Sequence, residues 1–317
     1  MSGTSLLDAL AHRRRTGSRP GQRDDDFRIA LAIEGGGNRA AYSAGMALAL
    51  DEAGLTDAFD DVYGTSAGAL NGAWLLTGHA RRWIRSWAWP EVAAAGVTDP
   101  RRVLRGGPLI DLGRLVHHVY ESITPMDFEA VLANPVRFHP MATDARTGEA
   151  TDLSPYVEDR LSLQTALRAS SCLPLLAGRP VRLAGRTYVD GGLSEGVPYR
   201  TALADGATHV LVLRTRRTDQ HAAPPSRLER ALLAPYFLLH GRHAGRAHVE
   251  RHRSYAADDL HLAEASVAPV ATLVEVRPPL ASPDISRLSS KLDEIADAIE
   301  RGRVTMSNVL QRRESPA

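Results

Sequence analysis

Two apolar segments near the start of the chain each end in a glycine-rich turn and continue into a helix-like segment. Residues 28–34 (RIALAIE) indicate a buried strand, followed by three glycines and by small, helix-forming residues at 38–50. Residues 59–64 (FDDVYG) indicate a second strand, which leads through another glycine turn into an apolar helix at 67–76. This repeated strand–turn–helix order predicts a mainly parallel β-sheet with helices on its faces.

The second half of the chain extends the same α/β pattern. Local patterns predict strands at 136–148 (with a turn), 186–192, 208–215 and 271–278, and helices at 163–171, 228–256 and 284–302. Pro235 is expected to kink or break the helix at 228–256. The helix at 284–302 is amphipathic, because Leu288, Leu292, Ile295 and Ile299 recur on one face.

The domain organisation is predicted to be simple. A chain of 317 residues can bury a substantial core. Residues 1–26 are polar, basic and then acidic, and we expect a flexible tail with at most a short helix at 6–11. No segment resembles a linker between two globular units, so residues 27–317 are expected to form one domain.

The charge balance argues against nucleic-acid binding. Lys and Arg together number 38 and Asp and Glu 37, which gives a net charge of +1. Lys291 is the only lysine, so nearly all basic residues are arginines. Because the arginines are scattered along the chain, we attribute their excess mainly to composition.

The cysteine content and the hydropathy pattern favour a cytoplasmic location. Cys172 is the only cysteine, so no intramolecular disulfide can form and no cysteine-based zinc cluster is expected. The N-terminal segment lacks the apolar region of a signal peptide, and no window of 18 uninterrupted apolar residues predicts a transmembrane helix.

The first glycine turn, which runs from Glu34 to Arg39 (EGGGNR), is a candidate anion-binding site. Consecutive glycines allow positive φ angles and bring several backbone N–H groups together at the start of a helix. Such a nest binds a phosphate or stabilises an oxyanion during acyl transfer. The alternative is a tight strand-to-helix turn without a ligand.

A dinucleotide-binding role is disfavoured. Gly35, Gly37 and Ala40 satisfy the G-x-G-x-x-G/A pattern. However, the acidic residues at 51–52 fall on the first helix, whereas that reading requires one at the end of the second strand. The lysine of a phosphate-binding P-loop is also missing, because Lys291 lies far away in the sequence.

The second glycine turn, from Gly64 to Gly68 (GTSAG), matches the G-x-S-x-G nucleophile elbow. A strand precedes it and a helix follows it, as that motif requires. The sharp turn exposes the Ser66 hydroxyl at the carboxyl edge of the sheet, and the helix N-terminus offers the N–H of Ala67. This context favours a catalytic serine.

The third motif, Asp190-Gly191-Gly192, ends a predicted strand. It places a carboxylate at the same carboxyl edge of the sheet, where ligands bind in α/β proteins. Taken alone, an aspartate followed by glycines at a strand end indicates only a turn.

In chain order, the three motifs resemble the patatin-like phospholipase family. The similarity extends over about residues 28–216 and includes the segments 142–149 (ATDARTGE), 167–174 (LRASSCLP), 185–198 (GRTYVDGGLSEGVP) and 208–216 (THVLVLRTR). The resemblance implies a three-layer α/β/α sandwich of modified α/β hydrolase type with a mainly parallel central sheet, as in bacterial single-domain members.

The resemblance also implies the roles of individual residues. Ser66 would be the nucleophile and Asp190 its general base in a Ser–Asp dyad, acting on a carboxylic ester of a lipid as a phospholipase A or lysophospholipase does. The implied oxyanion site comprises Gly35, Gly36, Gly37, Asn38, Arg39 and Ala67, and the turn glycines are Gly64, Gly68, Gly191 and Gly192. Arg39 either adds positive potential near a phosphate or holds the loop through a salt bridge. No cofactor and no metal are expected.

Two alternative functions remain open. A Ser-Asp-His triad would use one of His79, His139 and His209, of which only His209 follows Asp190 in the chain. His209 begins a strand rather than following one, so we expect a structural histidine, and we expect Asp144 to cap a turn. The other alternative is a non-catalytic anion- or lipid-binding protein with the same fold.

Peripheral membrane contact is a further expectation. Trp83, Trp87 and Trp89 are interleaved with arginines and either dock at a bilayer or pack on the core; packing is favoured. Residues 235–243 (PYFLLHGRH) form another apolar stretch that could line an acyl pocket, and the N-terminal arginines would attract anionic lipid weakly. The oligomeric state is not predicted.

Overall fold

The computed structural model describes residues 4–311, which form one mixed β-sheet with helices on its faces. The sheet has eight strands: β1 (Ile29–Ile33), β2 (Asp61–Thr65), β3 (Arg137–Asp144), β4 (Ala150–Asp152), β5 (Val181–Leu183), β6 (Arg186–Asp190), β7 (His209–Leu213) and β8 (Leu273–Val276). The expected strands are present, and β4 and β5 are short additions.

The strand order places the two glycine turns side by side. The order is β5-β6-β3-β2-β1-β7-β8, with β4 paired to β3. The five strands from β3 to β8 in this order pair in parallel, whereas β6 runs antiparallel to β3 and β5 antiparallel to β6. The carboxyl ends of β1 and β2 are therefore adjacent, and these are the ends that carry the EGGGNR and GTSAG turns.

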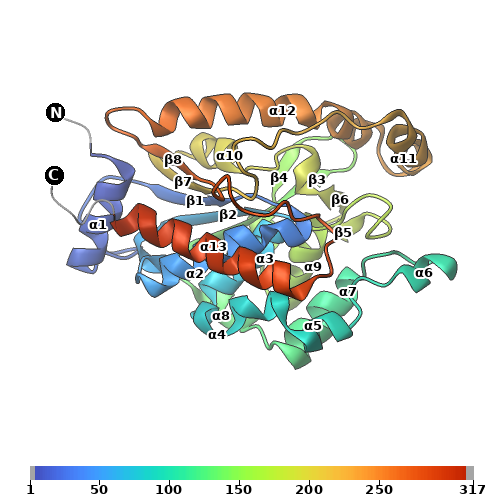
Figure 1. Cartoon of the computed structure of the whole chain (residues 1–317), viewed down its shortest axis with the longest axis horizontal. Helices are drawn as coiled ribbons and strands as arrows, with labels where there is room; N and C mark the ends of the chain where they lie inside the picture. The colour runs from blue at the N-terminus through green and yellow to red at the C-terminus, as the bar shows by residue number, and fades with distance from the viewer. Residues whose placement is uncertain (1–3, 312–317) are drawn as a thin grey trace.

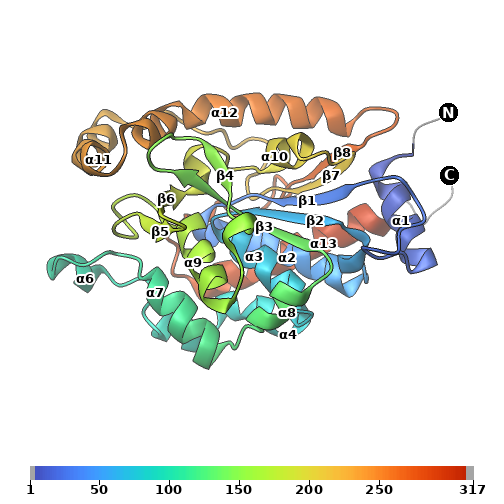
Figure 2. The same cartoon turned by 180° about the vertical axis from the view of Figure 1, so that it is seen from behind.

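Helices cover both faces of the sheet, which makes a three-layer α/β/α sandwich (Figures 1 and 2). One face carries α10 (Tyr199–Ala204) and α12 (Arg242–Ser266). The other face carries α2 (Ala41–Glu52), α3 (Ala67–Leu76), α9 (Arg160–Ser170) and α13 (Leu292–Gln311). The remaining α-helices of the described residues are α1 (Leu6–Thr16), α4 (Ala80–Trp83), α5 (Pro90–Ala94), α6 (Pro100–Leu104), α7 (Leu112–Arg114), α8 (Phe128–Ala133) and α11 (Arg227–His240), and a π-helix (Leu115–Ile123) follows α7. The predicted fold class is confirmed.

The N-terminal segment differs from the expected flexible tail. Residues 1–3 lie outside the described residues, but α1 packs on the core through Leu6 and Leu10, both of which are buried. Arg13 on the same helix is fully buried and forms ion pairs of 2.7 Å with Asp25 and Asp60. The acidic cluster that made this segment look like a tail instead supplies a counterion for the arginine.

Two helix boundaries in the second half also differ from expectation. The long helix at 228–256 is interrupted at Gly241, between α11 and α12, and Pro235 lies inside α11. Gly241 has a φ of 156°, and a Cβ there would lie 1.9 Å from the carbonyl oxygen of Ala145, so a glycine is required for the close approach. The last helix begins at Leu292 rather than at residue 284, so Leu288 lies before it and is exposed.

The tryptophan segment packs against the core, as the favoured interpretation predicted. Trp83 and Trp87 are partly buried against the largest hydrophobic cluster. The Trp83 ring lies 6.5 Å from that of buried Trp74 and 5.7 Å from that of Trp89.

None of the helices in residues 4–311 combines the length and the hydropathy that crossing a bilayer requires.

Candidate active site

The GTSAG turn has the backbone strain of a nucleophile elbow. Ser66 joins β2 to α3 with φ 56° and ψ −127°, a conformation that costs a non-glycine residue about 1–3 kcal/mol. The turn is possible because its neighbours are small: a Cβ on Gly68 would lie 2.3 Å from the carbonyl oxygen of Ile33. The backbone N–H of Ser66 donates to Ser170 Oγ at 2.8 Å, which holds the elbow in place.

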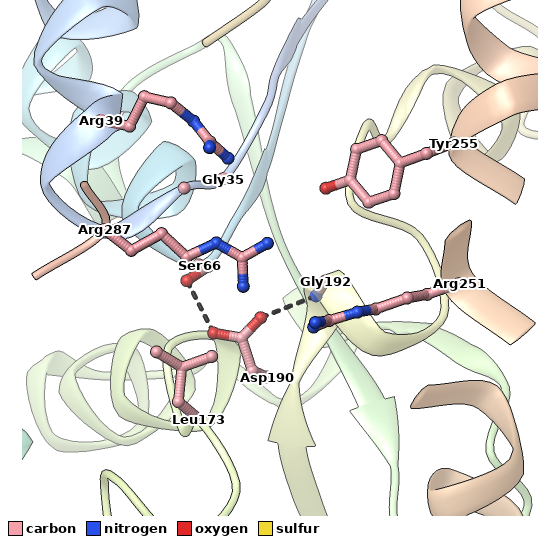
Figure 3. Close-up of a pocket in the computed structure, with 11 residues that line it drawn as sticks. Gly35, Arg39, Ser66, Leu173, Asp190, Gly192, Arg251, Tyr255 and Arg287 are labelled. Atoms are coloured by element: carbon pink, nitrogen blue, oxygen red, sulfur yellow. Dashed lines mark hydrogen bonds between the residues drawn. The ribbon is translucent and has the colours of Figure 1, made fainter. Parts of the chain in front are cut away.

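Asp190 lies directly opposite the serine. It ends β6, which pairs with β3, the neighbour of β2. Ser66 Oγ donates a hydrogen bond of 2.7 Å to Asp190 Oδ2, and the N–H of Gly192 donates to Asp190 Oδ1 at 2.8 Å (Figure 3). The two glycines of the DGG motif therefore turn the chain so that its backbone orients the carboxylate.

The carboxylate of Asp190 is nearly inaccessible to water. Asp190 is 2% exposed to solvent and Ser66 is 7% exposed. Burial raises the pKa of Asp190 above its ordinary value, although the hydrogen bonds from Ser66 and Gly192 and the charges of Arg287 and Arg251 oppose this rise. A carboxylate with a raised pKa is a stronger base than an aspartate in water, which suits it to accept the hydroxyl proton.

The EGGGNR turn supplies fewer free donors than the sequence suggested. The N–H of Gly35 donates to the carbonyl of Gly196 at 3.2 Å, and that of Asn38 donates to the carbonyl of Arg287 at 2.9 Å. Both predicted oxyanion donors are thus occupied, and Asn38 does not line the pocket. Within residues 4–311, the N–H groups of Gly36 and Gly37 have no hydrogen-bond partner, and both glycines line the pocket beside Ser66.

The remaining predicted site residues have structural or local roles. The N–H of Ala67, at the start of α3, has no partner among the described residues. Gly64 packs tightly below the elbow, because a Cβ there would lie 2.5 Å from the Cα of Ala69. Gly191 approaches the carbonyl of Met141 just as closely, so both glycines shape the turns rather than contact a ligand.

The histidines considered for a triad lie away from Ser66. His209 is the first residue of β7, at the amino edge of the sheet, where its Nε2 lies 3.0 Å from the carbonyl oxygen of Thr4. His79 is exposed beyond the far end of α3. Among the described residues that line the pocket, none is a histidine. Asp144 caps its turn, as expected, by accepting the N–H groups of Arg146 and Thr147.

His139 belongs to a separate cluster of side chains whose atoms are of the kinds that coordinate metal ions. Atoms of His139, Asp152 and Asp205 lie within 4.8 Å of one another. However, the His139 ring already bonds to Asp152 at 2.8 Å and to Asp61 at 3.0 Å. Although burial opposes it, these two carboxylates raise the pKa of His139 to about 9. In this structure the imidazole therefore lies between two carboxylates in an ion-pair network.

Sequence reasoning missed several residues of the pocket. Arg251 and Tyr255 come from α12, Arg287 from the segment before α13, and Leu173 from the loop after α9 (Figure 3). Arg39, which the sequence did place here, makes no ion pair in the described part of the chain, so the salt-bridge alternative for it is not supported. No local sequence motif marks Arg251, Tyr255 and Arg287, because only the tertiary fold brings these residues from the C-terminal part of the chain to the site.

A family model for patatin-like phospholipases matches residues 31–203, which is more than half of the chain. The chain belongs to the patatin-like phospholipase family. The match contains all three motifs described above, and it ends before Arg216, Arg251, Tyr255 and Arg287. Arg251, Tyr255 and Arg287, which line the pocket, therefore lie outside what the family model describes, whereas Arg39 lies within it.

Individual relatives of this patatin-like chain are distant. It is 33% identical over 213 residues to the uncharacterized protein YjjU of Escherichia coli K12, over 65% of this chain and 57% of that protein. Among solved structures it is similar to VipD from Legionella pneumophila (TM-score 0.48, 12% identity, 91% of this chain and 67% of that one). It is also similar to human GIVD cytosolic phospholipase A2 in complex with methyl gamma-linolenyl fluorophosphonate (TM-score 0.44, 16% identity, 96% and 61%).

Proposed function

We propose that this protein is a lipid acyl hydrolase that cleaves carboxylic esters through a Ser66–Asp190 dyad. The proposal rests on one observation above all, the 2.7 Å hydrogen bond from a strained, buried serine to a buried carboxylate. Membership of the patatin-like phospholipase family supports the same class of reaction. A phospholipase A or lysophospholipase is the subclass that we infer from the family.

The acylation step follows from the positions of the donors. Ser66 Oγ attacks the ester carbonyl carbon and gives its proton to Asp190 Oδ2. The carbonyl oxygen becomes negatively charged and accepts hydrogen bonds from the N–H groups of Gly36 and Gly37. The N–H of Ala67, at the N-terminus of α3, donates a further hydrogen bond to it. The C–O bond then breaks, the leaving alkoxide takes the proton from Asp190, and the acyl group stays on Ser66.

Deacylation repeats these roles with water. Asp190 accepts a proton from a water molecule that attacks the acyl carbonyl, and the same N–H groups hold the oxyanion. Collapse of the intermediate releases the carboxylic acid, and the proton returns to Ser66 Oγ. Asp190 has the position to serve both steps because its second oxygen is held by Gly192.

Two experiments separate this proposal from its rivals. A fluorophosphonate probe should label the wild-type protein at Ser66. Both Ser66→Ala and Asp190→Asn should lower the rate of p-nitrophenyl ester hydrolysis by a factor of about 10⁴ or more. Folded protein that is neither labelled nor active would favour the non-catalytic alternative. Loss of activity in His209→Ala, with Asp190→Asn still active, would favour the triad.

Access to lipid is proposed at the end of the molecule where α6 and α11 project (Figures 1 and 2). On α11, Leu228, Leu232 and Leu239 recur at helical spacing, and all three are exposed. On α6, Leu104 is 89% exposed. Arginines flank both helices, as at a surface that docks on anionic lipid. A cytoplasmic location, suggested by the single free Cys172, is part of the proposal.

A further inference from the structure

A second hollow of about 240 Å³ adjoins the pocket of the proposed dyad. The two cavities share four lining residues: Arg39, Arg251, Tyr255 and Arg287. Arg216 adds a further guanidinium to the second hollow. Four arginines from four separate segments of the chain therefore line one hollow, and three of them also line the pocket that contains Ser66.

The charges of these arginines are poorly balanced by the protein. Arg214, at the end of β7, contacts three carboxylates, those of Glu34, Asp259 and Glu275, at 2.7–3.0 Å. Arg216, two residues later, has no ion pair or hydrogen bond from its guanidinium within residues 4–311, although it is only 5% exposed. Its central carbon lies 4.3 Å from the centre of the ring of Tyr255, a cation–π contact.

Arg39 and Arg287, whose guanidinium groups line the same hollow, also lack ion pairs within the described residues. Arg39 Nε is buried without a partner, and the Arg287 side chain makes no ion pair within the described part of the chain. Burial and the charge of Arg216 lower the pKa of Arg39 to about 10. Arg251 has a carboxylate, Glu229, at 3.5 Å, and burial together with Arg287 lowers its pKa. Among the four arginines of the hollow, only Arg251 has an ion pair within the described residues, so a ligand that supplies negative charge would offset the charge of the others.

The lining also limits which anion fits. The hollow contains one carboxylate, Asp284, and its Oδ1 is occupied by Gln220 at 2.6 Å. Arg216 already occupies one face of its aromatic ring, Tyr255, and a quaternary ammonium group would also meet the like charges of the arginines, so the lining disfavours such a group. Several guanidinium forks around one space match the oxygens of a phosphate, which carries more charge than a carboxylate.

We propose that this hollow binds the phosphate of a phosphate-bearing acyl ester whose carbonyl lies at Ser66, and that Arg216 and Arg287 select head groups with net negative charge. This inference rests on the proposed hydrolase function and deepens it. The four lining residues that the two cavities share make the hollow the immediate neighbour of the dyad pocket, and the proposal is that one substrate molecule occupies both. The acyl chain then leaves on the side away from the arginines, where Leu173 lies (Figure 3).

A matched set of substrates tests the selectivity. Rates are measured for oleoyl lysophosphatidic acid, oleoyl lysophosphatidylcholine and oleoylglycerol, which share the acyl chain and differ in head-group charge. The wild-type protein should have the highest kcat/KM for the phosphomonoester. In Arg216→Gln and Arg287→Gln, the ratio of kcat/KM for the phosphomonoester over oleoylglycerol should fall about 10- to 100-fold, as expected for a lost charge-assisted hydrogen bond.

Two further variants control for charge and folding. Arg216→Lys keeps the charge without the fork and should lie between the wild type and Arg216→Gln. Arg15→Gln removes an exposed arginine on α1 and should leave the ratio unchanged. Arg287 lies in a partly exposed loop, so Arg287→Gln tests the proposal even where Arg216→Gln fails to fold. A ratio within twofold of the wild type in both glutamine variants would overturn the proposal.

A binding experiment keeps this inference separate from the hydrolase proposal. Calorimetry on the Ser66→Ala protein should detect binding of inorganic phosphate. Adding Arg216→Gln to this protein should abolish that binding. In active protein, phosphate should inhibit cleavage of the phosphomonoester competitively. If the wild type hydrolyses no ester, the hydrolase proposal fails while calorimetry still tests the hollow. If phosphate binds but does not compete, the site holds free phosphate and the head-group inference is wrong.

Discussion

The backbone N–H of Asn38 donates to the carbonyl oxygen of Arg287 at 2.9 Å, although 249 positions separate the two residues in the sequence. This bond ties the glycine turn after β1 to the segment before α13. The side chain of Asn38 reinforces it by donating to the carbonyl of Ser289 at 2.6 Å. The proposed oxyanion donors Gly36 and Gly37 are thus fixed from outside by a late segment of the chain.

Replacing Gly37 with alanine should disable the site. Its φ is +56°, and a Cβ would lie 2.5 Å from the carbonyl oxygen of Arg287, so the loop must move away from its anchor. We expect kcat to fall about 10²- to 10³-fold, the usual cost of losing an oxyanion donor. Gly54→Ala is the matched control, because Gly54 has a φ of +67° with no heavy atom near its Cβ. Equal activity in the two variants would contradict the role of the loop.

The pH dependence of kcat/KM should reflect the titration of Asp190. Burial raises its pKa, so activity should decline on the acidic side at a higher pH than for an ordinary aspartate, by about tenfold per pH unit. Because the charge of Arg287 lowers the pKa of Asp190, Arg287→Gln should move this decline to higher pH. Rates with an uncharged ester measure the shift, and a decline that stays in place would argue that another group is titrating.

Asp190→Asn should abolish activity and yet stabilise the protein at neutral pH. A carboxyl with a raised folded-state pKa favours folding when protonated, below its unfolded value of about 3.9, and loses that contribution as the pH rises through the folded value. At pH 7 the ionised, buried carboxylate therefore costs stability, and asparagine removes this cost. Thermal unfolding should show a higher Tm at pH 7 and a shrinking difference towards pH 4. A lower Tm at pH 7 would contradict the assignment.

The N-terminal helix should contribute strongly to stability. Arg13 is buried and donates to Asp25, to Asp60 and to the carbonyl oxygens of Ala58 and Phe27. Arg13→Ala should cost about 3–5 kcal/mol of unfolding free energy, because Asp25 loses its ion-pair partner and Asp60 keeps only Arg23. Arg15→Ala, on the exposed side of the same helix, should cost less than about 0.5 kcal/mol. Denaturant titration measures both, and equal effects would indicate that α1 is only loosely attached.

Vesicle binding should depend on α11 rather than on the tryptophan segment. Replacing Leu232 and Leu239 with serine should weaken binding to phosphatidylglycerol vesicles about tenfold or more, because each leucine loses apolar burial. Val267→Ser is a control on an equally exposed residue beyond the other end of α12. Trp83→Ala should instead lower Tm, because its ring packs on Trp74. Unchanged binding in the leucine variant would rule out this surface.

The sequence predicted those parts of the site that local geometry determines. A strand followed by a glycine turn and a helix is a short-range pattern, so Ser66 and the loop at Gly36 and Gly37 could be placed from it. The sequence also placed Asp190 beside Ser66, but for a reason that does not hold, because β6 runs antiparallel to β3. Asp190 reaches the elbow because it pairs with Ala142, next to Met141, which pairs with Thr65. The hydrogen-bond partners of Gly35 and Asn38 could not be foreseen, since they come from segments far along the chain.

Longer-range packing explains the remaining differences. The burial of Arg13 depends on acidic residues that look like part of a solvated tail until the fold brings them against α1. The helix break at Gly241 rather than at Pro235 depends on contact with Ala145, which no helix propensity encodes. Arg216 and Arg287 reach the site through β7 and through the approach to α13. Among so many arginines, composition gave no reason to single them out.

The strand order sets a practical boundary for work with this protein. The family match ends at residue 203, whereas β7, which begins at His209, pairs with β1 in the middle of the sheet. A recombinant fragment trimmed to the match would leave one whole side of β1 without hydrogen-bond partners, an open edge that invites other chains to add to it. Such a fragment should precipitate rather than report on activity. Fragments for crystallisation or screening must extend beyond β8 and the Arg287 segment.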